Sequence, residues 1–357
     1  MSQDESQKKG QLAKIILTIT FVGVLVATIF GYQKYQEIFG MSVPKSMGEV
    51  TVEIPTNSSF EEVVDILKSE QLIQHEEAFR WVAERMKYPR NPMRSGKFKI
   101  QPGWSNYELI QHLRGGKQET VKLVFNHAWT VKNVAAKVAE FIEPDSSELI
   151  ALFNNEQYLS DLGYSTATLM SLFIPNTYDF FWNTSPAKFL ERMKREHESF
   201  WNKNDRKAKA KALGLTPEEV YVLASIVERE TNQNDEKRRM AGVYYNRLKT
   251  KGWRLEADPT VKFAVGDFGL RRILNTHLQL DSPYNTYKYG GLPPGPISMA
   301  SIASIDAVLN VEKHDYMFFC SKGDGSGYHS FAKSLKQHNR NAAIYRANMR
   351  KSGAWNN

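Results

Sequence analysis

The feature that most constrains this chain is one uninterrupted apolar segment near its start, Ile15–Tyr32, which contains 18 residues and no charge. A helix needs roughly 20 apolar residues to cross a bilayer, with about 17 as the lower limit. Lys14 and Lys34 flank the segment and can extend their ammonium groups to the lipid headgroups. No small-x-small cleavage site follows, so the sequence favours a retained membrane helix over a cleaved signal peptide. No other segment is as long and as apolar, which predicts a single-pass protein.

The lysines around this segment predict its orientation. Three lysines precede it, whereas only Lys34 and Lys45 lie between it and residue 48. Because positive charge accumulates on the cytoplasmic side of a membrane, this mild bias places residues 1–14 in the cytoplasm, as a disordered tail, and the bulk of the chain outside. Residues 33–48 are then expected to form a juxtamembrane linker.

The rest of the chain divides into two parts at Gly115-Gly116. In residues 49–116, strands are expected at Val50–Ile54 and Gly96–Ile100, with two helices between them and a third after them. Residues 117–357 contain several expected helices and a few short strands. The sequence therefore predicts an α+β fold with one N-terminal transmembrane helix, a small α/β subdomain and a larger mixed α+β domain.

The charge and the cysteine count narrow the classes of partner and site. A net charge of +8 and a pI near 9.2 favour an acidic partner, which could be nucleic acid, a membrane surface or an anionic polymer. Nucleic acid is disfavoured, because the basic segment Ala187–Leu213, expected as one long helix with a solvated face, lacks interleaved stacking aromatics. The single cysteine, Cys320, excludes an intrachain disulfide and a Cys-rich zinc site. It lies in an expected buried strand, Tyr316–Cys320, and His329 and His338 show no zinc spacing, so we predict no metal and no cofactor.

A helix expected to begin at Thr216-Pro217 carries the candidate acid. Threonine is a good N-cap and proline suits the first helical position. Apolar residues recur from Val220 to Val227 at helical spacing, and extending that face by one turn reaches Glu230. A carboxyl group on an apolar face has a raised pKa, which suits a general acid. Glu228 lies on another face. The alternative is a charged helix end that simply leaves the core.

Six short motifs occur in a fixed order from this helix to the C-terminal region: Leu223–Thr231, Val243–Leu248, Leu255–Val261, Ser282–Tyr287, Gly291–Ile297, and Tyr328–Phe331 with Gln337–Asn339. In these motifs the chain resembles the endolytic murein transglycosylase family, the YceG-like or MltG group, from about Val50 to its end. In that family the glutamate directly before a threonine or serine is the catalytic acid, which implies Glu230, before Thr231. The resemblance also implies a LysM-like subdomain at 49–116 and a catalytic domain at 117–357.

The resemblance further implies substrate-binding residues within these motifs: Asn246, Asp258, Thr260, Tyr284, Asn285 and His329. The loop Leu280–Pro296, which holds Tyr284 and Asn285, suits sugar recognition through ring stacking and hydrogen bonds to hydroxyls, although the same residues could merely fasten the loop. Asp258 has a structural alternative as the N-cap of a following helix. Where the family usually carries aspartate in the motif Phe173–Tyr178, this chain has Asn176, which could keep a turn or hydrogen-bonding role but not an ionised one.

The implied reaction uses one carboxyl group twice. Glu230 would protonate the glycosidic oxygen between N-acetylmuramic acid and N-acetylglucosamine, and would then remove the proton from the muramic C6 hydroxyl, giving a 1,6-anhydro end. A hydrolase usually needs two carboxyl groups, and Glu228 or Asp258 could supply the second. A membrane-tethered glycan-binding protein without turnover is the third possibility. The resemblance makes peptidoglycan strands the expected partner, with penicillin-binding proteins as further partners.

Overall fold

The computed structural model describes residues 3–270 and 272–352, with side chains from residue 10 onward. It divides into two compact units, Met1–Val121 with Phe180–Asn183, and Lys122–Asp179 with Thr184–Asn357. Short two-stranded sheets and many helices make up both units, which confirms a mixed α+β fold. The expected boundary at residues 115–116 lies within a few residues of this division.

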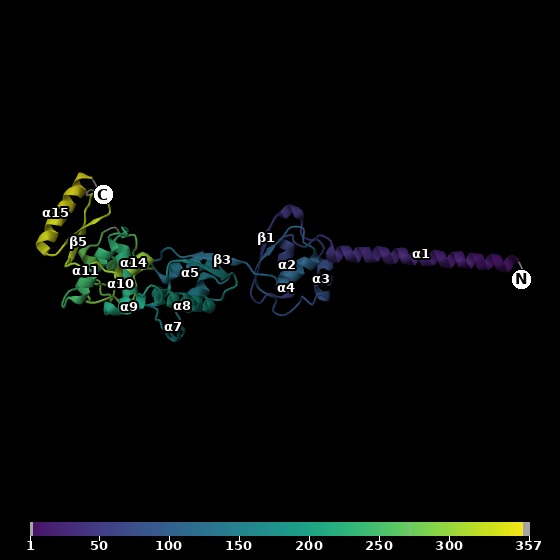
Figure 1. The fold of residues 1–357 in the computed structure, drawn as a ribbon, viewed down its shortest axis with the longest axis horizontal. Coiled ribbons are helices and arrows are strands. Elements are labelled where there is room, and N and C mark those ends of the chain that lie inside the picture. Colours follow the sequence, from purple (N-terminus) through teal and green to yellow (C-terminus); the bar gives the residue numbers. More distant parts are fainter. Residues whose placement is uncertain (1–2, 271, 353–357) are drawn as a thin grey trace. The chain divides into compact units, whose positions relative to one another are not determined.

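The first unit begins with one long helix, α1, Gln3–Phe39 (Figure 1). Its portion Gly10–Phe39 is long and apolar enough to cross a membrane. The expected span 15–32 lies inside it, but the helix continues in both directions, so the prediction of a disordered tail is wrong from residue 3 onward. Glutamine, glutamate and lysine are good helix formers, and residues added to an existing helix avoid the cost of nucleation.

The expected linker 33–48 is also more ordered than its sequence indicates. The last turns of α1 occupy its first half, and a short 3-10 helix, η1, covers Lys45–Met47. Between them, Val43 is fully buried in the core of the unit, and its backbone N–H donates to the carbonyl of Trp104 at 2.9 Å. A single valine in a short irregular segment gives no periodic signal, which is why the sequence alone did not reveal this contact.

The small subdomain follows the predicted order of strand, helix, helix, strand, helix. Its elements are β1 (Val50–Ile54), α2 (Phe60–Ser69), α3 (Glu76–Arg85), β2 (Gly96–Ile100) and α4 (Asn106–Gly115). The two strands pair antiparallel, with Val50 opposite Ile100 and Ile54 opposite Gly96. Alternation along the strands directs Val52, Ile54 and Phe98 into a core completed by the apolar faces of the three helices.

The remaining elements run from β3 to α15. They are β3 (Thr120–Val124), α5 (Val131–Ala139), α6 (Ser146–Phe153), α7 (Glu156–Leu162), η2 (Leu169–Leu172), β4 (Thr177–Phe181), α8 (Pro186–Asn202), α9 (Arg206–Ala212), α10 (Pro217–Glu230), α11 (Lys237–Lys249), α12 (Asp258–Val265), α13 (Asn275–Leu278), α14 (Ile302–Leu309), β5 (Phe318–Ser321), β6 (His329–Ala332) and α15 (Leu335–Lys351). The basic segment expected as one helix is two, α8 and α9. The chain breaks between them at Asn204 and Asp205, whose φ angles of 59° and 56° lie in the left-handed region that these residue types tolerate.

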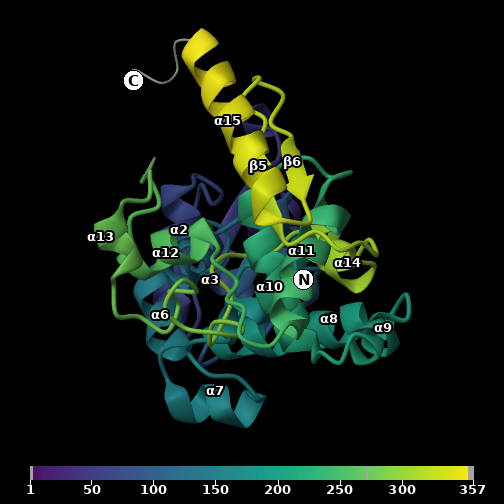
Figure 2. The same cartoon turned by 90° about the vertical axis from the view of Figure 1, so that its left-hand side faces the viewer.

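Helix α10 is the centre of the second unit and contacts α9, α11, α12 and α14 (Figure 2). It begins as predicted: the Thr216 hydroxyl accepts from the Glu219 N–H, and the Glu219 carboxylate accepts from the Thr216 N–H. The eight residues from Val220 to Val227 are all buried, so the helix is enclosed on every side rather than along one stripe. The carboxyl groups at its C-terminal end are thereby held at fixed positions.

A hairpin and a helix complete the unit. Strands β5 and β6 pair antiparallel, with Phe318 opposite Ala332, and the glycine-rich segment between them is the expected turn. Helix α15 lies beside both strands (Figure 2). The prediction of a buried strand at Tyr316–Cys320 is wrong: the strand covers Phe318–Ser321, and all four of its residues keep part of their surface exposed and line a cavity described below.

Candidate active site

Glu230 is the last residue of α10, and its carboxyl group faces the neighbouring helix α11. The Tyr244 hydroxyl of α11 donates a short hydrogen bond to Glu230 Oε1. Tyr244 is fully buried, and its ring packs edge-to-face on Phe319 of β5 at 5.8 Å between centroids. Because the Tyr244 ring is fully buried and packed, it has little freedom to rotate, and it therefore holds the Glu230 carboxyl in one orientation.

The surroundings of Glu230 change its acidity. Burial, helped by the nearby charge of Asp258, raises the pKa of its carboxyl from 4.5 to about 7. The hydrogen bond from Tyr244 and the positive potential of His329 and Arg247 act in the opposite direction. A carboxyl group with a pKa near 7 is present in both protonation states at neutral pH, and can therefore give a proton and later accept one.

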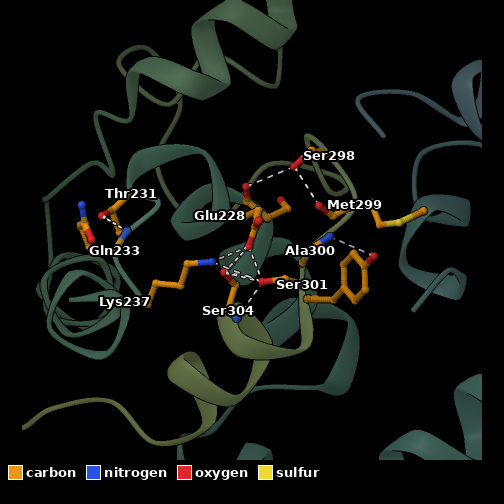
Figure 3. Close-up of polar contacts among 11 residues, drawn as sticks. Glu228, Thr231, Gln233, Lys237, Ser298, Met299, Ala300, Ser301 and Ser304 are labelled. Atoms are coloured by element: carbon orange, nitrogen blue, oxygen red, sulfur yellow. Dashed lines mark hydrogen bonds and ion pairs between the residues drawn. The ribbon is translucent and has the colours of Figure 1, made fainter. Parts of the chain in front are cut away.

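Glu228, two residues earlier, has a different environment. It accepts hydrogen bonds from the Ser301 and Ser304 hydroxyls and an ion pair from Lys237 Nζ at 2.9 Å (Figure 3). Burial alone would raise the pKa of Glu228, but these three donors outweigh it and lower the pKa below its ordinary value. Glu228 is therefore an ionised structural carboxylate that joins α10 to α11 and to the start of α14.

Asp258 does not cap a helix, so that prediction is wrong. Helix α12 has Ala257 at its N-cap without a side-chain hydrogen bond, and Asp258 is already the first helical residue. Its Oδ1 instead accepts from the Tyr287 hydroxyl at 2.7 Å, and the side chain is exposed. An acidic residue in the first turn still interacts favourably with the helix dipole, but Asp258 remains available to a ligand.

His329 is held by a buried acid. Its Nδ1 lies 2.7 Å from Glu236 Oε2, and its backbone N–H donates to Glu236 Oε1 at 2.9 Å. The Thr231 hydroxyl also donates to Glu236, at 3.3 Å. Glu236 therefore connects the residue that follows Glu230 to the first residue of β6, and so fixes the imidazole relative to the candidate acid.

Two cavities meet at Glu230 and Asp258, which line both of them. The first cavity lies against the hairpin and α15, and its other lining residues include Arg247, Glu256, Tyr287, Phe319, Cys320 and His329. The second lies on the side of α12, with Trp129, Arg229, Asn232, Lys262 and Arg272 among its lining residues. The two carboxyl groups therefore lie where a ligand that fills both cavities would pass.

Comparison with known proteins places this arrangement in a family. The model of the YceG-like family matches residues 52–344, more than half of the chain. The chain belongs to the YceG-like family. It is 30% identical over 308 residues to the endolytic murein transglycosylase of Bacillus subtilis strain 168, covering 82% of this chain and 83% of that protein.

Other relatives support the assignment. The chain is 26% identical over 365 residues to the endolytic murein transglycosylase of Streptococcus pneumoniae strain D39, with 93% of this chain and 65% of that protein covered. It thus spans about two thirds of the length of the pneumococcal relative. A crystal structure of a YceG-like protein from Listeria monocytogenes superimposes with a TM-score of 0.54 at 25% identity, covering 82% of this chain and 98% of that one.

Two of the residues expected to bind substrate are buried and have structural partners in this YceG-like chain. Thr260 is fully buried, and its hydroxyl donates to the Ala257 carbonyl and pairs with the Thr286 hydroxyl. Asn285 is also fully buried, and its side-chain amide donates to the carbonyls of Leu278 and Leu280. Asn285 therefore fastens the loop, the alternative that the sequence left open, and Thr260 joins α12 to the same loop.

Asn246 and Tyr284 also lie outside the two cavities at Glu230. The Asn246 amide donates to the carbonyls of His314 and Tyr316, at 2.8 and 3.1 Å, and holds the segment before β5. The ring of Tyr284 is half-buried against Phe263, 4.6 Å between centroids. Of the expected substrate-binding residues, only Asp258 and His329 share a cavity with Glu230.

Other residues around Glu230 were not singled out from the sequence. Tyr244 and Arg247 lie three residues apart on α11, within the motif Val243–Leu248, and point to the same region. Arg247 is buried and donates from Nε to the Met317 carbonyl at 2.8 Å, which ties α11 to the start of β5. Tyr287 belongs to the loop expected to carry sugar-binding residues. The available signal for each was its place within one of the six motifs.

Two further features concern metal ligands and the asparagine at position 176. Over the described ranges, no group of three or more His, Cys, Asp or Glu side chains is arranged to hold a metal ion. Asn176 precedes β4, where its side-chain oxygen accepts from the Thr177 N–H at 2.8 Å. This is the turn-type role that an amide can fill as well as a carboxylate.

Proposed function

We propose that this chain is a membrane-anchored endolytic lytic transglycosylase that cleaves the bond between N-acetylmuramic acid and N-acetylglucosamine in peptidoglycan strands and leaves 1,6-anhydro ends. The relatives from Bacillus subtilis and Streptococcus pneumoniae named as endolytic murein transglycosylases support the activity. The observation that carries the mechanism is the position of Glu230, with a pKa near 7, between two cavities.

In the first step the protonated Glu230 donates its proton to the bridging glycosidic oxygen. The C1–O bond breaks, the N-acetylglucosamine side leaves with a hydroxyl, and positive charge develops at C1 and the ring oxygen of the muramic acid. The Asp258 side chain lines the same cavities, where a carboxylate favours this developing positive charge. In the second step the Glu230 carboxylate removes the proton of the C6 hydroxyl, O6 bonds to C1, and Glu230 is protonated again. No water is consumed.

The environments of Glu228 and Glu230 favour Glu230 as the residue that makes both proton transfers. Glu228 is engaged by Lys237, Ser301 and Ser304, and its lowered pKa makes it a poor acid near neutral pH. Tyr244 binds one oxygen of Glu230, and no hydrogen bond within the described residues engages the other oxygen. That oxygen is the one available to the substrate.

A muramidase-type hydrolase is the second candidate, and a specific observation favours it. Asp258 does not cap helix α12, its side chain is exposed, and it lines both cavities together with Glu230. Two carboxyl groups that flank a scissile bond are the usual machinery of glycoside hydrolysis. Under this alternative Asp258 would activate water or attack C1.

Cleavage within a strand, rather than at its end, agrees with the two cavities. A polymer that occupies both can extend to either side of Glu230, whereas a single closed pocket would admit only a chain end. The long apolar helix α1 supports a single-pass anchor in the cytoplasmic membrane, with the catalytic domain on the outer side. We also propose that peptidoglycan synthases such as penicillin-binding proteins act nearby, and that no nucleic acid binds.

The small subdomain is proposed to be LysM-like. Its two antiparallel strands enclose two helices in the chain order strand, helix, helix, strand, which is the order of such modules. Contact with glycan strands would raise the local concentration of substrate at the catalytic domain. A spacer without affinity of its own is the alternative.

Mass spectrometry of reaction products tests the proposed function. The full-length chain in detergent micelles is incubated with purified peptidoglycan in water enriched in oxygen-18. A lytic transglycosylase gives anhydro-muramic ends, 18 mass units lighter than reducing ends and without label, because the reaction takes up no water. Reducing ends that carry the label would establish hydrolysis and refute the transglycosylase proposal, and strands bound without cleavage would favour a binding protein.

A further inference from the structure

Arg229 lies between the two glutamates of α10 in sequence but forms an ion pair with neither. Glu228 is paired with Lys237, and Glu230 is bonded to Tyr244. No ion pair within 4 Å joins Arg229 to an acidic residue of the described chain. Its guanidinium lies 3.8 Å from the centre of the Trp129 ring, and one terminal nitrogen donates a long bond of 3.4 Å to the Ala128 carbonyl.

The hydrogen-bonding capacity of this guanidinium is mostly unused. Its Nε is buried and has no partner among the residues that the structure describes. Burial lowers the pKa of Arg229, and the charge of nearby Glu228 only partly opposes this effect. A buried donor without a partner and a cation without a counter-ion both cost free energy, so a site that keeps them requires a reason.

The second cavity, on the side of α12, is where this cation is exposed. Lys262 and Arg272 line the same cavity, so three cationic side chains share it. Of the acids in its lining, Glu228 is neutralised by Lys237, and Glu230 is protonated for much of the time at neutral pH. Asp258 is the remaining anion. The cavity is therefore net positive, immediately beside the candidate acid.

The aromatic ring against which Arg229 lies is itself held in place by stacking. The Trp129 ring stacks on Phe268 with 4.6 Å between centroids and an angle of 25° between planes. The arginine is thus held against a fixed aromatic surface by cation–π attraction and one long hydrogen bond. Rotation about its terminal torsions is enough to present the unused N–H groups to a ligand, and a guanidinium can hold both oxygens of a carboxylate at once.

We propose that Arg229, with Lys262 and Arg272, forms a subsite for a carboxylate carried by the glycan strand next to the scissile bond. The inference rests on the proposed function, since it takes its ligand from the same polymer. Each muramyl residue bears a lactyl group that ends either in a free carboxylate or in a peptide with carboxylates of its own. Both sources present the same chemistry to the cavity, and the geometry selects anionic strands over neutral ones.

The test compares matched strands with and without negative charge. Full-length protein in detergent is assayed for release of chain ends on peptide-bearing strands and on amidase-treated strands with free lactyl groups. Each is assayed again after carbodiimide coupling to ammonia, which turns carboxylates into amides. The variants are Arg229→Gln, which removes the charge, and Arg195→Gln, which removes one charge from an exposed position of α8.

We expect Arg229→Gln to raise KM about tenfold on a charged strand with kcat nearly unchanged, as loss of one hydrogen bond to a charged group implies. The strand type that shows this loss identifies the carboxylate, lactyl or peptide. On amidated strands, wild type and Arg229→Gln should be equal, and Arg195→Gln should match wild type throughout. An equal loss on charged and amidated strands, or no loss on either charged strand, overturns the proposal.

A binding measurement distinguishes the failure of this proposal from the failure of the proposed function. Calorimetry with the disaccharide of N-acetylglucosamine and N-acetylmuramic acid, and with its lactyl amide, needs no turnover. If no anhydro ends form but the acid disaccharide binds wild type about tenfold more tightly than Arg229→Gln, and the amide binds both equally, the carboxylate subsite stands and the activity assignment fails. Equal binding of acid and amide by wild type, with cleavage intact and no charge preference, removes the subsite and leaves the activity.

Discussion

Replacing Glu230 by glutamine should make the protein more stable at neutral pH while removing its activity. The folded state raises the pKa of this carboxyl from 4.5 to about 7, because burial disfavours the charged form. At about 1.4 kcal/mol for each pH unit, that difference corresponds to about 3 kcal/mol. Glutamine keeps the shape and one oxygen acceptor for Tyr244 but cannot ionise, so it avoids this cost.

Proton linkage determines the direction in which the stability of the wild type changes with pH. Between pH 4.5 and about 7 the folded protein holds a proton on Glu230 that the unfolded chain has lost, so the stability of the wild type falls as pH rises. Below this range both states are protonated, and above it both are ionised and the full cost is present. The stability advantage of Glu230→Gln should therefore be smallest near pH 4.5, grow through the range, and level off above pH 7.

Hydrogen exchange followed by mass spectrometry on full-length protein in detergent measures this difference within the second unit. Peptides from α10 report the free energy of opening of wild type and Glu230→Gln at four pH values from 4.5 to 7.5, after correction for intrinsic exchange. Subtracting the two cancels the titration of every other group. A difference that stays flat across the range would refute the raised pKa, and with it the reason for assigning the acid to this residue.

Further predictions concern the neighbours of Glu230. Tyr244→Phe removes a hydrogen bond that lowers the pKa of Glu230, so the fall of kcat/KM at alkaline pH should move to higher pH, measured as a pH–rate profile. Asp258→Asn removes a charge that raises the same pKa, and should move that limb to lower pH; no shift in the profile would contradict the coupling. Glu228→Gln leaves the ammonium group of Lys237, whose side chain is 5% exposed, without its anion. This variant should lower the free energy of unfolding, measured with denaturant, by about 3 kcal/mol. The double variant Glu228→Gln with Lys237→Met should recover most of that loss. Equal stability of the single and double variants would show that the ion pair is not the cause.

Local patterns in the sequence were enough to predict the helix that carries the acid. A threonine cap and a proline determine where α10 begins, and the helical apolar repeat identifies one of the faces that it buries, because these are interactions within a turn or two. The same periodicity placed Glu230 apart from Glu228, and the strands β1 and β2 followed from alternation. Each of these inferences needs only neighbours in the chain.

The partners of Glu230 depend on packing between segments, which periodicity does not encode. Tyr244 is 14 residues away and Tyr287 is 29 residues from Asp258, and neither distance belongs to a repeating pattern. The capping role expected for Asp258 was wrong because the helix begins one residue earlier, and helix starts vary by that much. The partner of Thr260 also comes from packing between segments, because its hydroxyl pairs with that of Thr286 in a neighbouring loop.

The most direct test of the central claim compares two conservative variants in one assay. Full-length wild type, Glu230→Gln and Glu228→Gln are brought to equal folded concentration, and the rate of formation of anhydro-muramic ends from peptidoglycan is measured by mass spectrometry. The account predicts that Glu230→Gln lowers kcat by about 10²–10⁴-fold, as expected for loss of a general acid and base, and that folded Glu228→Gln stays within about tenfold of wild type. Retained activity in Glu230→Gln, or selective loss in folded Glu228→Gln, would contradict it.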